Sequence, residues 1–241
     1  MRLVTWAEDP SLADRGVASA DVWPEYNLHG DVFDDHWDPA LERFPEGQFA
    51  LLDGDVVVAE AHTGRLSWDG DDATLPSGID AALVACTGGN TLCALAAEVS
   101  PEARARGVAA EILGGMRSIA ESLGLQRMIA PVRPSWKERY PITPIEQYVT
   151  YRRADGQLLD PWMRVHERLG ARVGAPLPES LRITGTVAEW ESWTGLSFPA
   201  SGDYVFPEGL APVHIDTDAD RGSYWEPNVW MIHPDLPASR G

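Results

Sequence analysis

Two arginines and a glycine stand just before an expected helix, where they could bind an anion. The segment from Val99 to Ala109 reads V-S-P-E-A-R-A-R-G-V-A, with Arg104, Arg106 and Gly107 near its end. The first turn of a helix carries unpaired backbone N–H groups and the positive end of the helix dipole. Gly107 would let a ligand approach that backbone without meeting a side chain. The spacing therefore predicts a site for a compact anion.

The elements that position these residues can be read from the hydrophobic pattern. An apolar run from Thr91 to Val99 predicts a strand that ends just before the loop. Apolar residues recur at helical spacing over residues 108–123, and Gly124 stands where a C-terminal cap belongs, which predicts an amphipathic helix. A second apolar run, from Arg127 to Val132, predicts the next strand. The anion site would therefore lie between a strand and a helix.

This order of elements, with the spacing R-x-x-G-x-A from Arg104 to Ala109, resembles the pyrophosphate loop of the GNAT superfamily, the acyl-CoA-dependent N-acyltransferases. The resemblance is specific over residues 91–134, moderate over 160–170, and elsewhere limited to the order of elements. It implies a mixed α/β fold with a central mixed sheet and flanking helices. In that fold the strand Leu92–Val99 would splay from the strand Arg127–Val132 and leave a cleft for pantetheine.

The resemblance also implies acetyl-CoA or another acyl-CoA as the co-substrate, and no metal. The donor-binding residues that it implies are Val99, Arg104, Arg106, Gly107, Val108, Ala109 and Ala110. The backbone N–H near Val99 would polarise the thioester carbonyl, as in an oxyanion site. The alternative is an ordinary strand–helix–strand unit in which Gly107 only permits close packing.

Two residues are candidates for the proton transfers that acyl transfer to an amine needs. The run V-H-E-R-L-G-A from Val165 to Ala171 resembles a stretch of the family in which a tyrosine often acts as general acid, and His166 stands at the tyrosine's position. An imidazole that titrates near ~6.5 can donate a proton at neutral pH. Glu98, on the strand beside the cleft, is the candidate for the base that takes the amine's proton. The alternatives are a His166 that only packs and a Glu98 at the surface.

A long segment after Pro134 departs from the short family pattern and predicts the acceptor pocket. Long loops in compact domains are commonly functional. Its candidates for substrate binding are Tyr148, Tyr151, Arg152 and Arg153. One of the two arginines would pair with a carboxylate of the acceptor or with the 3′-phosphate of CoA. Because the insertions would enclose the cleft, a small-molecule amine is the favoured acceptor, with a protein amine as the alternative.

The resemblance implies that the N-terminal part covers the acceptor site. Residues 11–20 predict a helix, and Gln48 to Ala61 reads as a hairpin about Asp53 and Gly54. Four aromatic residues between them are candidates for a wall of the substrate pocket: Trp23, Tyr26, Phe33 and Trp37. His29 and His36 lie near three aspartates, but their spacing matches no recognised pattern of metal ligands.

The length of 241 residues and the 44% of hydrophobic residues suit one elaborated domain. We expect an acceptor-covering part over residues 1–90, an acyl-CoA-binding core over 91–134, and a long loop, a helix and C-terminal strands over 135–241. Asp160 and Pro161 would open that helix as its N-cap and first residue. The C-terminal strands are expected at 180–187, 213–216 and 228–233, with a short helix over 188–194.

Charge is distributed unevenly along the chain. The net charge is −18, yet residues 101–172 hold 12 of the 19 basic and 8 of the 37 acidic residues, a balance of +4. An acidic protein is a poor general nucleic-acid binder, whereas a local basic region suits a compact polyanion such as CoA. It would also suit the acidic surface of an acyl carrier protein. The alternative function is therefore a silent acyl-CoA sensor, or a domain that binds an acyl group on a carrier's phosphopantetheine arm.

The remaining expectations concern location and assembly. No stretch approaches the apolar length of a signal peptide or a membrane span, which predicts a cytoplasmic protein without membrane contact. Cys86 and Cys93 are too few for a disulfide framework and are predicted to be buried thiols. A homodimer with the C-terminal strands at its seam is possible on this pattern.

Overall fold

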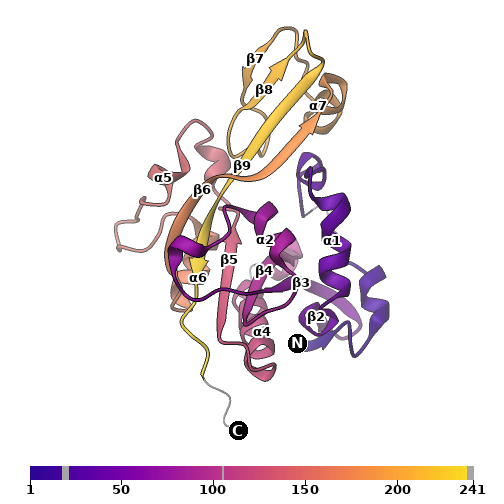
Figure 1. Ribbon diagram of the computed structural model, residues 1–241, viewed down its shortest axis with the longest axis vertical. Helices are drawn as coiled ribbons and strands as arrows, with labels where there is room; N and C mark the ends of the chain where they lie inside the picture. Colours follow the sequence, from indigo (N-terminus) through magenta and orange to yellow (C-terminus); the bar gives the residue numbers. More distant parts are fainter. Residues whose placement is uncertain (18–21, 105, 238–241) are drawn as a thin grey trace.

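A mixed β-sheet runs through the computed structural model, which describes residues 1–17, 22–104 and 106–237 (Figure 1). The strands are β1 (Arg2–Thr5), β2 (Phe49–Asp53), β3 (Val56–Leu66), β4 (Thr91–Val99), β5 (Arg127–Val132), β6 (Arg172–Gly185), β7 (Gly202–Tyr204), β8 (Val213–Asp216) and β9 (Arg221–Ile232). Their order is β1-β2-β3-β4-β5-β9-β8-β7, and β6 pairs with β9. The pair β4–β5 is parallel and the others are antiparallel, so the sheet is mixed, as predicted.

Helices cover both faces of this sheet. The α-helices are α1 (Phe33–Glu42), α2 (Ile79–Ala85), α3 (Pro101–Arg104), α4 (Val108–Ser122), α5 (Ile145–Tyr148), α6 (Pro161–Arg168) and α7 (Val187–Thr194). Short 3-10 helices are η1 (Pro10–Asp14), η2 (Glu25–Leu28), η3 (Pro45–Gly47), η4 (Asp72–Thr74) and η5 (Lys137–Arg139). One buried cluster packs α4, α5 and α6 on the sheet, and a second packs α1 and α2 on it. We call these sides the α4 face and the α1 face.

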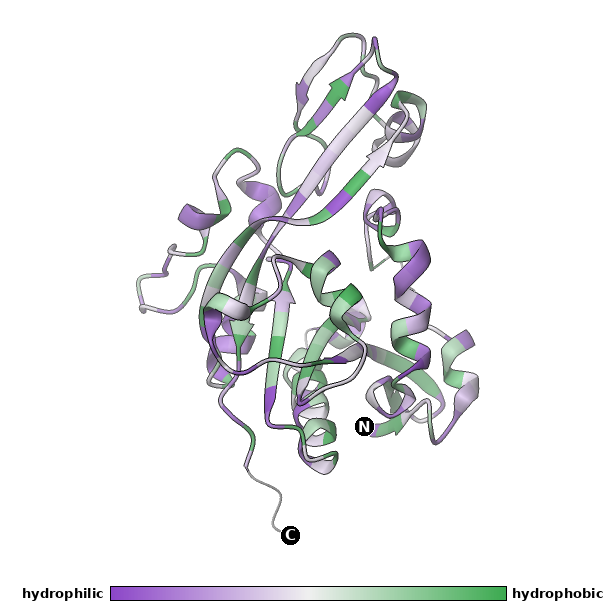
Figure 2. Ribbon diagram, in the orientation of Figure 1, coloured by the Kyte–Doolittle hydropathy of each residue, from purple (hydrophilic) through white to green (hydrophobic). Residues whose placement is uncertain are grey.

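The hydrophobic pattern explains the central elements. The strands β4 and β5 consist mostly of hydrophobic residues, whereas α1 is hydrophilic over much of its length (Figure 2). Helix α4 buries Val108, Ile112 and Met116 completely, at helical spacing. It follows Gly107, whose φ of 81° is left-handed. The predicted strands at 91–99 and 127–132 and the predicted helix after Gly107 are therefore confirmed.

The strands β4 and β5 separate after three residue pairs. Thr91, Leu92 and Cys93 pair with the first three residues of β5, and beyond Cys93 the two strands no longer pair. The rest of β5 pairs with β9, while β4 stays paired with β3 along its whole length. A bulge places Leu95 as an extra residue at the point of separation, because His62 pairs with Ala96 and Thr63 with Ala94. The predicted splay between these two strands is present.

The C-terminal strands form an arm. In Figure 1, β7, β8 and α7 project beyond the rest, together with the adjoining ends of β6 and β9. We call this part the C-terminal arm. Its core contains Trp190, Phe206 and Tyr224, whose rings pack edge to face. Tyr26 of η2 inserts among them, so the N-terminal segment is tied to the arm.

Some predicted boundaries differ from the structure. Instead of a helix over 11–20 there is the 3-10 helix η1, and residues 18–20 lie outside the described residues. The strand expected at 180–187 begins earlier, at Arg172, because two register shifts let it follow β9 past its prolines. Helix α6 begins at Pro161 after the N-cap Asp160, as predicted. No helix among the described residues is both long and apolar enough to cross a membrane.

Candidate functional site

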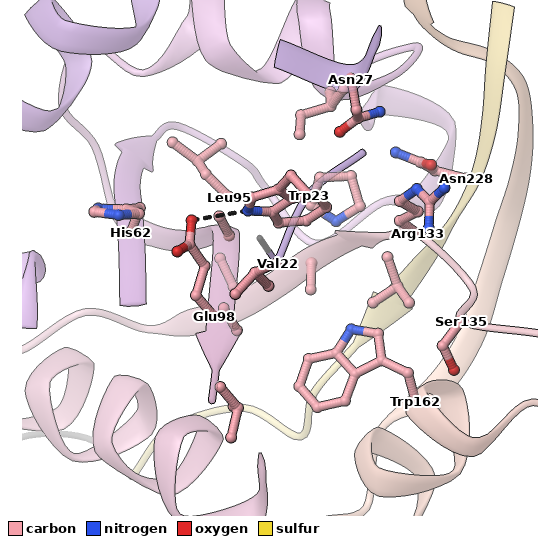
Figure 3. Close-up of a pocket in the computed structure, with 18 of the residues that line it drawn as sticks. Val22, Trp23, Asn27, His62, Leu95, Glu98, Arg133, Ser135, Trp162 and Asn228 are labelled. Carbon is pink, nitrogen blue, oxygen red and sulfur yellow. Dashed lines mark hydrogen bonds between the residues drawn. The ribbon is translucent and has the colours of Figure 1, made fainter. Parts of the chain in front are cut away.

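A cavity of about 740 Å³ opens where β4 and β5 separate. Both strands line it, along with α4, α6, β9 and the N-terminal segment around Trp23 (Figure 3). Its volume is within the range of small-molecule sites. The cavity therefore lies where the splay of the two strands predicts a cleft.

The turn between α3 and α4 borders one end of the cavity. Val99, Arg104 and Ala109 line it, as expected for donor-binding residues. Arg104 also donates from Nε to the Val99 carbonyl at 3.0 Å, which holds its side chain at the end of β4. Among the residues that the structure describes, no atom outside the adjoining chain lies within 4 Å of the position that a Cβ of Gly107 would take. The first turn of α4 is thus open to an anion.

The other predicted donor-binding residues occupy different environments. Arg106 is exposed and pairs with Asp53 at 2.9 Å, an ion pair of the kind that contributes little to stability. Ala110 is exposed, and its N–H donates to the Gly107 carbonyl. Val108 is fully buried under the turn, so only its backbone could meet a ligand.

Two neighbouring carboxylates, Glu98 and Glu60, lie at another part of the cavity, where Glu98 is half-buried and lines the wall and Glu60 is buried. Glu98 accepts a hydrogen bond from Trp23 Nε1 at 2.8 Å (Figure 3). Its cross-strand neighbour is Glu60 on β3. Burial raises the pKa of Glu98. Burial and then the charge of Glu98 raise the pKa of Glu60 to about 7. Such a carboxyl pair can take up a proton near neutral pH.

His62 lies beside this pair and completes the cluster. Its Nε2 is 3.9 Å from Glu60 Oε1, and its Nδ1 is buried without a hydrogen-bond partner among the described residues. Burial lowers the pKa of His62 to about 4, so the ring is neutral beside the glutamates.

His166 lines the cavity from α6 but is neutral. Its Nδ1 lies 3.0 Å from His233 Nε2, and its Nε2 has no hydrogen-bond partner within the described chain. Burial, and then His233, lower the pKa of His166 well below its ordinary value. The expectation that it titrates near neutral pH is therefore wrong. A neutral ring can still donate or accept one hydrogen bond through Nε2.

The four residues predicted to bind the acceptor do not line the cavity. Tyr148 is buried and donates to Asp160 Oδ2 at 2.9 Å, and the Tyr151 ring packs on the Tyr148 ring. Arg152 pairs with Glu167 at 2.5 Å, and Arg153 lies 3.5 Å from Asp155. The Tyr148 hydroxyl and the two guanidinium groups are engaged within the long loop and with α6, and none of the four residues lines the cavity.

Polar residues that the sequence pattern did not single out take this place. Arg133 and Ser135 follow β5, Asn228 lies on β9 and Asn27 on η2, and all four line the cavity. The position of Arg133 just after a buried strand was the available signal, because the carboxyl ends of such strands commonly carry binding residues. Asn27 and Asn228 carried no such signal.

The described residues contain no cluster of three or more His, Cys, Asp or Glu that could hold a metal ion. Cys86 and Cys93 are both buried and unbridged, as predicted.

Comparisons with known proteins agree with this architecture. No protein-family model matches the chain. Over 93% of its length it is 28% identical to the arginine N-acetyltransferase avaD of Aspergillus versicolor, covering 89% of that protein. The loading GNATL domain of CurA from Lyngbya majuscula superposes with a TM-score of 0.63 at 18% identity, over 98% of this chain and 97% of that one. The GphF GNAT-like decarboxylase, solved with isobutyryl-CoA, gives 0.62 at 20% identity, over 98% and 100%. The chain therefore has the GNAT-like acyltransferase fold, and over most of its length it is similar to an N-acetyltransferase.

Proposed function

We propose that this protein transfers an acyl group from acyl-CoA directly to the amine of a small molecule. The observation that carries the proposal is the cavity itself, which runs from the Arg104–Ala109 turn to Glu98 between the two splayed strands. A phosphate-binding turn and a proton acceptor thereby share one enclosed space. The similarity to an arginine N-acetyltransferase supports the same reaction class.

The donor would be held by the turn and by the gap between the strands. The pyrophosphate of acyl-CoA would meet the first turn of α4 and the side chain of Arg106, which an exposed ion pair with Asp53 only weakly restrains. The pantetheine would pass between β4 and β5, where unpaired backbone beyond Cys93 can hydrogen-bond it. The acyl group would then reach the part of the cavity that Glu98 and Trp23 border.

The chemistry needs a neutral amine and a place for its proton. Glu98 would take the proton as the amine attacks the thioester carbonyl, so that a C–N bond forms and the C–S bond breaks. The departing thiolate would receive a proton, and CoA would leave as the thiol. His166 is the second candidate for this proton movement, because its unpartnered Nε2 is buried at the cavity. No covalent enzyme intermediate is needed.

The experiment is a thiol-release assay with acetyl-CoA and a panel of amines that includes arginine, lysine and simple alkylamines. We expect turnover with at least one amine. Glu98→Gln should lower kcat by about 10²- to 10⁴-fold with little change in the affinity for acetyl-CoA. The matched control is Glu42→Gln, an exposed residue at the end of α1, which should keep full activity. If none of the amines supports thiol release, or if the Glu98→Gln variant is fully active, the proposal is contradicted.

A second candidate is transfer from an acyl group on the phosphopantetheine arm of a carrier protein. The gap between β4 and β5 would take the same pantetheine from either source. The open first turn of α4 favours CoA, because only CoA carries a pyrophosphate and a 3′-phosphate there. An acyl-carrier donor that outcompetes acetyl-CoA at low salt and fails at high salt would instead favour the carrier.

A further inference from the structure

Asn228 presents an unpaired amide to the cavity. Its side chain is 2% exposed and lines the cavity, and its Oδ1 has no hydrogen-bond partner among the described residues. An amide buried without partners costs free energy, so such a group in a cavity wall is typical of a ligand contact. Because no internal bond fixes the amide, it can turn either its oxygen or its NH₂ group toward a ligand.

Arg133 lies next to this amide and is held in place from behind. Val132 is the last β5 residue to pair with β9, opposite Val229, so Arg133 comes next to Asn228. Its Nε donates to Glu226 Oε1 at 3.1 Å, and its Nη2 donates to the Glu208 carbonyl at 2.8 Å. Figure 3 shows the guanidinium and the amide at the same end of the cavity.

The guanidinium of Arg133 is charged, and one of its nitrogens makes no hydrogen bond to the described residues. Burial lowers the pKa of Arg133, but Glu226 and then Tyr26 outweigh it and raise the pKa overall. Nη2 also donates to the Tyr26 hydroxyl at 2.9 Å. These bonds use Nε and Nη2, and within the described chain Nη1 has no such partner. Nη1 is therefore available to a ligand in a fixed orientation.

Arg133 Nη1 and the Asn228 amide match a carboxylate. Both groups can donate, and a carboxylate accepts several hydrogen bonds at once. Ser135 also lines the cavity, but Figure 3 shows it beside Trp162, away from these two groups. The carboxylate of Glu226 lines the cavity too, but its oxygens accept hydrogen bonds from Arg133, Asn27 and Tyr26, which leaves Nη1 and the Asn228 amide to face a ligand.

The location points to the acceptor rather than to the donor. On β9, Val229 and Met231 pack on the α4 face and Trp230 on the α1 face, so Asn228 faces the α1 side. On β4, Ala97 and Val99 pack on the α4 face, so Glu98 also faces the α1 side. The phosphate-binding turn belongs to α4, on the other face. A carboxylate near Arg133 and an amine near Glu98 would thus enter on one molecule.

We propose that the acceptor is an amino acid, whose carboxylate binds Arg133 and Asn228 while its amine faces Glu98. This inference rests on the acyl-transfer function proposed above. Figure 3 shows Trp23 between the two ends of this site, where its indole can pack against the acceptor. Asn228 is then a specificity-determining residue that selects acceptors with a carboxylate.

The test compares amino acids with the amines that lack only the carboxylate: arginine with agmatine, lysine with cadaverine, and phenylalanine with phenethylamine. In the wild type, kcat/KM should be at least about tenfold higher for the amino acid of the preferred pair. Asn228→Leu should raise KM for that amino acid about tenfold, with a much smaller effect on its partner amine and on kcat. Asn228→Asp should reverse the preference, because the new carboxylate repels the substrate's and attracts an amine.

Two further measurements distinguish a role of Asn228 in substrate binding from a role in the stability of the fold. The melting temperature of Asn228→Leu should not fall, because the amide Oδ1 has no internal partner to lose. His214→Gln, on the exposed side of β8 in the C-terminal arm, is the control and should change neither kinetics nor acceptor preference. A variant that melts early and slows both members of a pair equally would assign Asn228 a structural role and overturn the proposal.

The remaining outcomes are also decisive. Equal rates for amino acid and amine, or turnover of amines alone, would overturn the carboxylate site and leave the acyl-transfer function standing. If Asn228→Leu instead weakens the use of succinyl-CoA relative to acetyl-CoA, the carboxylate belongs to the donor's acyl group and the acceptor assignment is wrong. If neither the amino acids nor the amines are turned over, the function proposed above is refuted, and this inference with it.

Discussion

Two glutamates placed side by side on neighbouring strands are the least expected feature at the scale of single residues. Glu60 and Glu98 are cross-strand partners, and Glu60 is 5% exposed. Like charges directly opposite each other in a sheet are destabilising. The arrangement is tolerable because one carboxyl can remain protonated, which the pKa of about 7 for Glu60 provides. A protein that only needed a stable sheet would gain from an apolar pair at this position.

This pair predicts a dependence of stability on pH. The pKa of Glu60 is raised from 4.5 to about 7 by folding, so the folded state binds its proton more tightly than the unfolded state does. Stability is then lost as the pH rises from about 4.5 to about 7. Glu60→Gln removes this loss. Its free energy of unfolding relative to the wild type should increase between pH 4.5 and pH 8 by roughly 3 kcal/mol.

Denaturant titrations of both proteins at several pH values would measure this difference. His62, His166 and His233 have the opposite effect on the protein. Because burial lowers the pKa of each, the protein loses stability through them as the pH falls. To a first approximation, the contributions of His166, on α6, and of His233, after β9, are common to the variant and the wild type and cancel in the difference. For Glu111→Gln, an exposed substitution, the difference in the free energy of unfolding from the wild type should not change with pH. If the difference for Glu60→Gln does not change with pH either, Glu60 is ionised in the folded protein throughout.

Sequence reasoning identified Glu98 but could not identify its surroundings. The alternation of a strand cannot be phased from one sequence, so the cavity position of Glu98 was a hypothesis until β4 was placed. The pKa predicted for His166 was wrong because the ring is buried beside His233, and His233 follows the end of β9, far along the chain. Asn228 and Asn27 were missed because an isolated asparagine near a strand or a turn has no distinctive pattern.

At the scale of elements, the start of α4 determines how an anion could bind. Gly107 precedes the helix with a φ of 81°, a region that costs other residues about 1–2 kcal/mol. The space around its missing Cβ is open, so the cost of a side chain here is one of backbone strain and of access, not of packing. Gly114, in the middle of the same helix, also has open space around it.

These two glycines give a matched pair of substitutions. Gly107→Ala should lower the free energy of unfolding by about 1 kcal/mol and weaken the binding of acetyl-CoA. Gly114→Ala should raise the free energy of unfolding by up to about 1 kcal/mol, since alanine favours a helix interior, and leave acetyl-CoA binding unchanged. Denaturation and calorimetry on the two variants check both statements. Equal acetyl-CoA affinities in the two variants would remove the α4 turn from the donor site.

The central elements were predictable because their signals are local. The helix over 108–122, the strands on either side of it and the N-cap Asp160 follow from spacing, capping and hydrophobic runs within a few residues. The long loop was misassigned for the opposite reason. Whether Arg152 faces a cavity or Glu167 depends on where α6 packs, and the sequence pattern does not contain that information.

At the scale of the whole molecule, the sheet separates two tasks. The α4 face carries the turn suited to phosphate, and the α1 face carries Glu98 and Asn228. The gap between β4 and β5 joins the two sides. The N-terminal segment is attached to the α1 side, because the Tyr26 hydroxyl donates to Glu226 at 3.0 Å while its ring packs in the C-terminal arm. Residues from both ends of the chain therefore build this side of the molecule.

The central claim is that acyl-CoA occupies the gap between the splayed strands, and calorimetric titration tests it most directly. Acetyl-CoA should bind the wild type with a dissociation constant on the order of micromolar. Ala109→Trp, which fills the cavity beside the turn, should abolish the binding heat and keep the same circular dichroism spectrum. Glu98→Gln should bind acetyl-CoA like the wild type. A wild type that does not bind acetyl-CoA, or a folded Ala109→Trp variant that binds it equally well, would contradict the account.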